Sequence, residues 1–296
     1  MRILITGAAG QLGTELCHQL EMGRCALGPL PAQLRGAEVT PVDLPDADLT
    51  KHAGADMLLR RYTPDVVINC AAFTQVDLAE SEPDAAFAAN ALAARNLAMA
   101  CEVAGAKLVH ISTDYVFSGD SARAYAETDL PCPASVYGET KLLGEQYVRD
   151  FCCRWFIVRT AWLYGRTGGN FVKTMLKLTA ENDSVKVVND QRGNPTNAED
   201  LAYHLLLLAA TEEYGLYHCT GNGVCSWYEF ASEIARLAGH SAEMIPCTTA
   251  DFPRPAKRPA NSALEHRMLR LTVGDHMRHW QDALADYISE MGHDTA

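Results

Sequence analysis

The sequence has no long apolar run. A helix that crosses a bilayer needs about 20 apolar residues in succession, and the longest candidate, residues 205–210, has six. The apolar N-terminal stretch stops at Gly7, which is too short for the core of a signal peptide. The sequence therefore predicts a cytoplasmic protein with no membrane partner.

Positive charge is also scarce. Lys and Arg number 25 against 37 Asp and Glu, so the formal net charge is -12. A nucleic-acid surface needs clustered basic side chains, and this balance argues against one. A small anionic ligand is still allowed, because a helix N-terminus and a few local cations can hold a diphosphate.

The ten cysteines lack the spacing of a metal site or a disulfide framework. They include no Cys-x-x-Cys pair and no Cys/His spacing typical of zinc. Several lie inside apolar runs, where a free thiol behaves as a small hydrophobic side chain. We expect buried free thiols, and the adjacent pair Cys152–Cys153 has no role that the sequence indicates.

Hairpin signals are missing from the first half of the chain, where strands and helices alternate. This alternation predicts an α/β fold of the Rossmann-like type, with a doubly wound parallel sheet. Strands are expected at residues 2–6, 38–42, 65–69, 107–112, 154–160 and 215–219, and helices at 12–20, 57–62, 85–104, 137–149 and 197–210.

A different pattern follows Ser226. Helices are expected at 228–239 and 281–291, on either side of a Pro-rich segment at 252–259. This pattern indicates a smaller, mainly helical substrate-binding cap that is interleaved with the first lobe. The predicted division assigns 1–165 and about 195–224 to a dinucleotide-binding domain, and about 166–194 and 225–296 to the cap.

A glycine-rich turn follows the first expected strand and opens the first helix. Its glycines are Gly7, Gly10 and Gly13, with Gln11 and Leu12 between the last two. Glycine lets backbone N–H groups approach a pyrophosphate, and the helix N-terminus favours its charge. The spacing is GxxGxxG, which departs from the simplest Rossmann pattern. We expect this turn to bind a dinucleotide.

Acidic residues follow the second expected strand. Asp43 stands where a carboxylate can accept hydrogen bonds from the adenosine ribose, which favours NAD over NADP. Asp48 and Leu49 come shortly after and are candidates for the adenine pocket. The sequence leaves the choice between NADPH and NADH open.

Tyr137 and Lys141 are the candidate proton-transfer pair. A spacing of four residues places both side chains on one helix face. A nearby ammonium favours the phenolate and would lower the pKa of the tyrosine from about 10. Thr113, at the end of the fourth expected strand, could hydrogen-bond a substrate carbonyl beside Tyr137.

Together these motifs resemble the dTDP-4-dehydrorhamnose reductase family of extended short-chain dehydrogenases/reductases. The resemblance covers nearly the whole chain and includes GAAGQLG (7–13), STDYVF (112–117), VYGETKLLGE (136–145), NDQRGNPT (189–196) and RPANSAL (258–264). It implies NAD(P)H-dependent reduction of the 4-keto group of dTDP-4-dehydro-6-deoxy-L-mannose to dTDP-L-rhamnose. Tyr137 would donate the proton, Lys141 would support it, and Thr113 would orient the keto oxygen.

The resemblance also implies the ligand contacts. Coenzyme contacts map onto Gly10, Gln11, Leu12, Asp43, Asp48, Leu49, Ala71, Ala72 and Thr74, and contacts to the sugar nucleotide map onto Asp114 and Trp162. Two departures are the loop at 23–37, which is longer than is usual in the family, and Phe73, where Tyr or His is commoner. Some members are homodimers bridged by Mg²⁺, and Glu15, Glu199 and Glu290 fall near the matching positions.

Several alternatives stay open. A nucleotide-sugar 4,6-dehydratase is disfavoured, because Thr113 is followed by Asp114 and Tyr115 rather than by an acidic pair. Another nucleotide-sugar reductase or an epimerase would use the same fold. A non-catalytic subunit resembling the regulatory β subunit of methionine adenosyltransferase is also compatible. The product stereochemistry and the oligomeric state are not fixed by the sequence.

Overall fold

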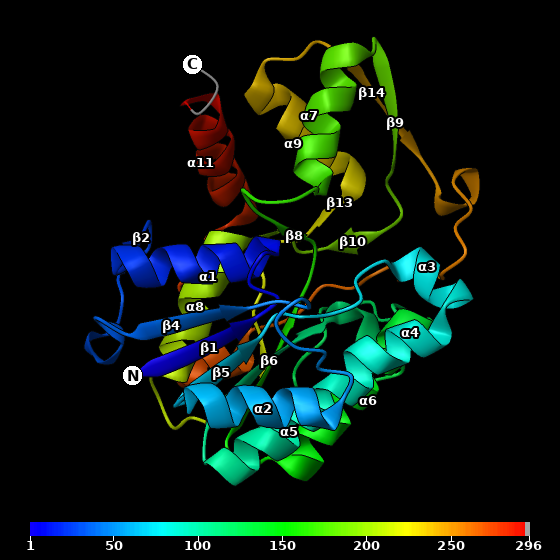
Figure 1. Cartoon of the computed structure of the whole chain (residues 1–296). Coiled ribbons are helices and arrows are strands. Elements are labelled where there is room, and N and C mark those ends of the chain that lie inside the picture. Colours follow the sequence, from blue (N-terminus) through cyan, green and yellow to red (C-terminus); the bar gives the residue numbers. More distant parts are fainter. Residues whose placement is uncertain (294–296) are drawn as a thin grey trace.

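A six-stranded parallel sheet forms the centre of the structure, a computed structural model that describes residues 1–293 (Figure 1). Its strands are rich in buried β-branched and aliphatic side chains, as expected of a parallel sheet that is covered on both faces. Across the sheet the order is β4 (Glu38–Val42), β1 (Arg2–Thr6), β5 (Val66–Asn69), β6 (Lys107–Thr113), β7 (Trp155–Thr160) and β12 (Gly215–His218).

Helices cover both faces of this sheet (Figure 1). One face packs against α1 (Gln11–Met22) and α8 (Ala198–Ala209), and the other against α2 (His52–Tyr62), α5 (Ala93–Ala104) and α6 (Val136–Phe151). Before α5 the chain forms α3 (Val76–Ser81), α4 (Pro83–Phe87) and a π-helical turn, η2 (Ala88–Leu92). The predicted doubly wound fold is thus confirmed.

The strand order reverses beside β1. Thr6 at the end of β1 pairs with Val42 of β4 on one side and with Asn69 of β5 on the other. The connections that leave β1 and β4 therefore run to opposite sides of the sheet. In open α/β sheets such a switch point, outside the carboxyl ends of the strands, is where ligands bind.

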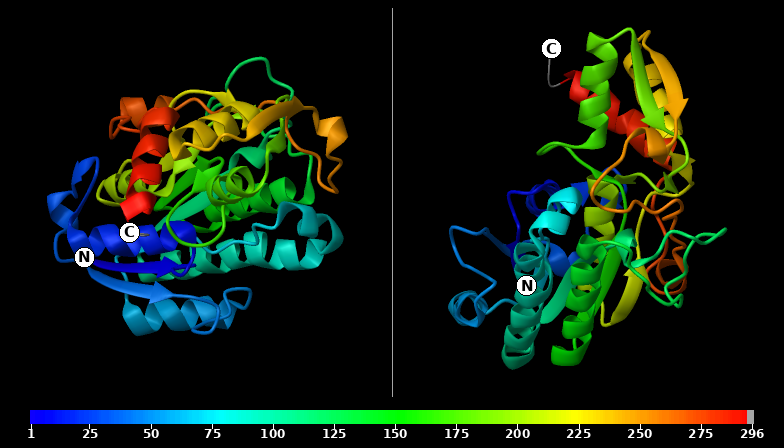
Figure 2. Two further views of the ribbon diagram at one scale, coloured as in Figure 1. Left: turned by 90° about the horizontal axis from the view of Figure 1, so that it is seen from above. Right: turned by 90° about the vertical axis from the view of Figure 1, so that its right-hand side faces the viewer.

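A second layer of helices, called the cap below, lies beyond those carboxyl ends (Figures 1 and 2). It contains α7 (Phe171–Glu181), α9 (Trp227–Ala238) and α11 (Trp280–His293), with the parallel pair β9 (Ser184–Val188) and β14 (Glu243–Cys247). Buried side chains of these elements share one core, which includes Val172, Val185, Phe230, Ile234 and Leu284.

Short elements complete the chain. The N-terminal half holds β2 (Arg24–Cys25), β3 (Gly28–Pro29), η1 (Ala32–Leu34) and η3 (Asp114–Val116). The parallel pair of β8 (Leu163–Tyr164) with β11 (Thr196–Asn197) and the antiparallel pair of β10 (Arg192–Gly193) with β13 (Cys225–Ser226) lie between the sheet and the cap (Figure 1). The remaining short elements are η4 (Thr249–Asp251) and α10 (Arg267–Leu271).

All six expected sheet strands form, and their ends differ from the predicted ends by one residue at most. The expected loop at 23–37 contains the short pair of β2 and β3.

All ten cysteines are free, and Cys132 and Cys153 are exposed rather than buried. Within residues 1–293, no helix has the length and apolarity needed to cross a membrane. The division into two lobes stays a prediction; Leu269 and Met277, from the C-terminal part, pack in the core beside α8.

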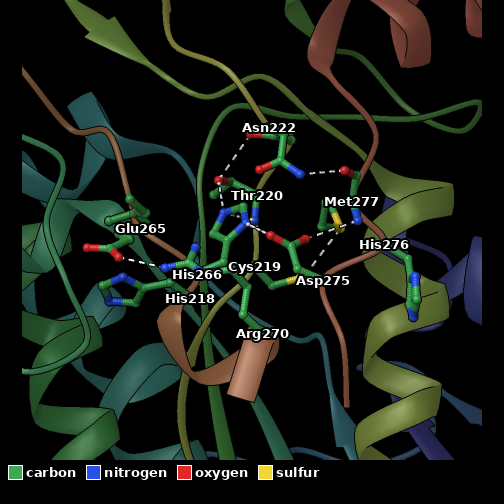
Figure 3. Close-up of polar contacts among 12 residues, drawn as sticks. His218, Cys219, Thr220, Asn222, Glu265, His266, Arg270, Asp275, His276 and Met277 are labelled. Carbon is green, nitrogen blue, oxygen red and sulfur yellow. Dashed lines mark hydrogen bonds and ion pairs between the residues drawn. The ribbon is translucent and has the colours of Figure 1, made fainter. Parts of the chain in front are cut away.

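Figure 3 shows a polar cluster that joins the C-terminal segment to the chain just after β12. The Thr220 hydroxyl lies 2.7 Å from Nε2 of His266, and the Thr220 backbone N–H donates to the same nitrogen at 3.2 Å. Because an N–H group can only donate, Nε2 is an acceptor and Nδ1–H of His266 donates to Asp275, 3.1 Å away. Thr220 and His266 are buried, so this cluster serves the packing of the fold.

The variant His266→Ala is expected to lower the free energy of unfolding by about 2–4 kcal/mol, because it leaves the Thr220 hydroxyl and the Asp275 carboxylate without their partner. Urea denaturation measures this change. Arg270→Ala is the control, since its ion pair with Glu265 is exposed and worth less than about 1 kcal/mol. Equal losses in the two variants would contradict a structural role for His266.

Candidate active site

A cavity of about 810 Å³ lies at the carboxyl ends of the strands, between the sheet and the cap. One part of the cavity lies at the switch point beside β1, where Thr6, Val42 and Cys70 line it. The predicted coenzyme, catalytic and substrate residues all line it, namely Gly7, Gly10, Gln11, Leu12, Gly13, Asp43, Asp48, Leu49, Ala71, Ala72, Thr74, Thr113, Asp114, Tyr137, Lys141 and Trp162. The structure thus brings together residues that are far apart in the sequence.

The glycine turn after β1 has no room for larger side chains. Gly7 has φ +67°, and a Cβ on it would lie 2.7 Å from the backbone nitrogen of Ala71. A Cβ on Gly13 would lie 2.3 Å from the carbonyl oxygen of Gly7. No side chain caps the N-terminus of α1, which leaves its first N–H groups for a ligand. This cradle fits the pyrophosphate of a dinucleotide.

Asp43 holds the turn from the side. Its Oδ2 accepts a hydrogen bond from the backbone N–H of Ala9 at 2.8 Å, so one carboxylate oxygen is already used within the protein. Lys141 is the single Lys or Arg among the described residues that line the cavity. The wall beside Asp43 therefore offers acidic side chains to the adenosine ribose and no cation to a 2′-phosphate.

Tyr137 and Lys141 lie in the first turns of α6, which begins where the Ser135 side chain accepts a hydrogen bond from the N–H of Gly138. Burial raises the pKa of Tyr137 above its usual range, and a hydrogen bond with Thr113 opposes this effect. The structure therefore differs from the expectation that Lys141 lowers this pKa. A raised pKa keeps the phenol protonated at neutral pH, as a proton donor requires.

Lys141 is almost fully buried, and its ammonium donates to the carbonyl oxygen of Ile111 at 2.6 Å. Burial lowers the pKa of Lys141 to about 8, against the opposing effect of Glu145. Asp114 also lines the cavity, and the Thr113 hydroxyl donates to it at 2.9 Å. Burial raises the pKa of Asp114 to about 6.

Two stacked indole rings form the wall between the sheet and the cap. The rings of Trp162 and Trp227 lie 3.5 Å apart and 7° from parallel, and both line the cavity. Trp162 has the left-handed φ of +48°, which is unusual for a side chain with a Cβ. It packs on Gly193, where a Cβ would come within 2.6 Å of the indole. Glycine at this position therefore makes room for the stack.

The sequence reasoning missed Trp227, which comes from the cap. Its local signal was a helix start, because Ser226 and Glu229 form a capping box around the first turn of α9. Nothing in that pattern points to the cavity. Tyr115 was also missed; it lines the cavity and packs edge-on against Tyr137 with ring centroids 5.5 Å apart.

Trp227→Ala is expected to raise KM for the sugar nucleotide that the resemblance implies as substrate by about tenfold, because Trp162 loses its stacking partner on the cavity wall. The ring contacts of Trp227 are with Trp162, Phe171 and Phe230 and not with the glycine turn, so the Kd for coenzyme is expected to stay within about twofold. Steady-state kinetics and coenzyme titration measure both values. An unchanged KM would show that the stack takes no part in substrate binding.

The three glutamates that the resemblance linked to Mg²⁺ have other partners. Glu290 pairs with Arg166 at 2.6 Å, Glu199 accepts from the backbone N–H of Ala26 at 2.9 Å, and Glu15 accepts from Gln19 at 3.0 Å. Within residues 1–293, no three His, Cys, Asp or Glu side chains form a group that could hold a metal ion. The described residues of one chain thus do not support the Mg²⁺ site that the resemblance implied. The homodimer stays a prediction.

The parallel sheet carries a dinucleotide cradle at its switch point and a Tyr–Lys pair in the same cavity. These features define a class, the NAD(P)-dependent oxidoreductases with a Rossmann-like fold. The chain belongs to the RmlD substrate binding domain family, whose model matches residues 1–293. The resemblance that the motifs indicated is thereby confirmed.

Individual relatives are similar over their full length. The dTDP-4-dehydrorhamnose reductase of Streptomyces griseus is 42% identical over 292 residues, which cover 96% of this chain and 92% of the relative. The crystal structure of a dTDP-4-dehydrorhamnose reductase from Clostridium acetobutylicum has a TM-score of 0.93 at 46% identity and covers 99% of this chain and 100% of its own. That of the Bacillus anthracis enzyme in complex with NADP has a TM-score of 0.91 at 41% identity, with 98% and 99% covered.

Proposed function

We propose that this chain catalyses the NAD(P)H-dependent reduction of the 4-keto group of dTDP-4-dehydro-6-deoxy-L-mannose, which gives dTDP-L-rhamnose in the cytoplasm. The observation that carries the proposal is the single cavity in which the glycine cradle, Thr113, Tyr137 and Lys141 meet. Membership of the family and the names of its relatives support the substrate.

The coenzyme supplies a hydride when bound, and the chain supplies the proton. The Tyr137 hydroxyl donates its proton to the keto oxygen as the carbon–oxygen double bond becomes a single bond, and the phenolate regains a proton from solvent. In this structure the Thr113 hydroxyl donates to Asp114 and accepts from the backbone N–H of Tyr115 at 3.2 Å. To orient the keto oxygen it turns its single proton from Asp114 to the substrate. The Lys141 ammonium stabilises the negative charge that develops on Tyr137.

The cradle would hold the coenzyme through Gly7, Gly10 and Gly13, with the pyrophosphate at the uncapped N-terminus of α1. Asp43 supports the use of NADH through the adenosine ribose, and the NADP complex of the Bacillus anthracis relative supports NADPH. We propose that the enzyme accepts both coenzymes. Asp114 and Trp162 would contact the sugar nucleotide.

The test is the loss of absorbance of NADPH or NADH when the purified protein meets dTDP-4-dehydrorhamnose. The expected result is stoichiometric oxidation, one coenzyme for each keto-sugar. Binding of coenzyme without net oxidation would contradict the proposal and would indicate an epimerase or a non-catalytic subunit.

A further inference from the structure

A buried carboxylate lies one helical turn beyond Lys141. Glu145 is completely buried, and Arg159 of β7 donates to its two oxygens at 2.8 and 2.7 Å. The Ser112 hydroxyl of β6 donates to it at 2.6 Å. These three hydrogen bonds fix the carboxylate between α6 and the sheet.

Stability alone does not account for this arrangement. The free energy needed to remove two charges from water offsets much of their attraction in a buried ion pair. Apolar side chains of similar size often replace such a pair without loss of stability. The position of Glu145 is more informative. Residues four apart share a helix face, so its charge acts on the ammonium of Lys141.

The other ionisable groups around Lys141 are neutral or cationic. Just after β5, burial raises the pKa of the Cys70 thiol far above neutrality, and on β6, burial lowers the pKa of His110 well below it. Arg159 of β7 is a cation and pairs with both oxygens of Glu145. Arg149 of α6 approaches Glu145 from the solvent side at 3.5 Å.

We propose that Glu145 is a positioning residue of the active site, whose fixed carboxylate keeps the ammonium of the buried Lys141 charged, one helical turn from Tyr137 on α6. The inference rests on the proposed function, since it is the proton transfer by Tyr137 that gives this charge a use. Glu145 itself does not line the cavity and acts through Lys141.

The consequence concerns the range of pH in which Lys141 carries its charge. Burial lowers the pKa of Lys141 to about 8 even with Glu145 in place. Without the carboxylate the pKa falls further, and the unpaired Arg159 adds to this effect. Lys141 would then lose its proton near neutral pH, and the alkaline limb of kcat/KM would move to lower pH.

The experiment is an NMR titration of the protein carrying ¹³C at Cε of its seven lysines, from about pH 6 to about pH 11. Lys141→Met identifies the signal of Lys141. In the wild type this signal is expected to titrate at lower pH than those of exposed lysines. In Glu145→Gln its midpoint is expected to fall by roughly one pH unit, and the alkaline limb of kcat/KM to fall by the same amount.

Asp200→Asn is the matched control. Asp200 is equally buried and pairs with Arg278 at 2.6 Å, but it lies on α8, which packs on the other face of the sheet. This variant is expected to lose stability and to leave the Lys141 midpoint in place. If Glu145→Gln does not fold, Glu145→Gln/Arg159→Met removes both charges and is expected to lower the midpoint by a smaller amount.

An unchanged midpoint in a folded Glu145 variant, or an equal fall in Asp200→Asn, would overturn the inference. The titration needs no turnover, so its result is independent of the proposed reaction. If the wild type fails to oxidise coenzyme with the keto-sugar, the proposed function fails whatever the titration gives.

Discussion

Replacing Tyr137 with phenylalanine is expected to lower kcat for keto-sugar reduction by about 10²–10⁴-fold, the range of general acid catalysis. The change removes the hydroxyl proton and keeps the ring that packs in the core beside Tyr115. Since the coenzyme cradle is untouched, the Kd for NADPH is expected to stay within about twofold. Stopped-flow or steady-state measurement of coenzyme oxidation gives the rate.

Tyr115→Phe is the matched control for this variant. It removes a hydroxyl that accepts a hydrogen bond from Arg258 at 3.2 Å, from a ring that lines the same cavity. Its expected effect on kcat is less than about tenfold, because the proposed proton transfer does not use it. Equal losses in Tyr137→Phe and Tyr115→Phe would mean that Tyr137 is not the proton donor.

Gly13→Ala is expected to weaken coenzyme binding by about 100-fold or more. The added Cβ would lie 2.3 Å from the Gly7 carbonyl oxygen and 2.6 Å from Cα of Ala8, so the turn would have to shift away from the ligand. A loss of this size corresponds to about 2.7 kcal/mol. Titration of coenzyme fluorescence gives the Kd, and circular dichroism shows whether the variant is folded.

Gly169→Ala provides the comparison for an added methyl group. Gly169 also lines the cavity, but nothing lies within 4 Å of a Cβ there. Its Kd for coenzyme is expected to match that of the wild type within about threefold. If Gly13→Ala folds and binds coenzyme as tightly as Gly169→Ala, the turn after β1 is not the pyrophosphate cradle.

The sheet and the coenzyme cradle could be predicted because their signals are local. Most of the strands are short, largely apolar runs, and the glycine turn follows the first one directly. Tyr137 and Lys141 are four residues apart on one helix, so their common face also follows from spacing. The parallel sheet then brings the ends of β1, β5 and β6 together, which is why the predicted residues line one cavity.

The rest of the site depends on contacts between distant segments. β9 and β14 pair in parallel although the chain forms β10, β11, α8, β12, β13 and α9 between them, and neither strand was predicted. Trp162 and Trp227 stack across the boundary between sheet and cap. The partners of Glu145 lie on two different strands, so no spacing in the sequence indicates that its charge is buried beside Lys141.

Burial also decides the direction of the pKa shifts, and the sequence does not give burial. The expected lowering of the Tyr137 pKa rested on a nearby ammonium alone and took no account of burial. In the structure both groups are buried, which raises the pKa of Tyr137 and lowers that of Lys141. Tyr137, the proposed donor, is therefore protonated at neutral pH. The charge of Lys141 responds more strongly to pH near neutrality than the protonation of Tyr137 does.

The most direct test of the account follows the hydride. Wild-type protein is given dTDP-4-dehydrorhamnose and reduced coenzyme in which both hydrogens at C4 of the nicotinamide ring are deuterium. The product is analysed by NMR and mass spectrometry. The account predicts a dTDP-6-deoxy-sugar with one deuterium at C4 and an equal amount of oxidised coenzyme. A product without deuterium at C4, or coenzyme that stays reduced, would contradict it.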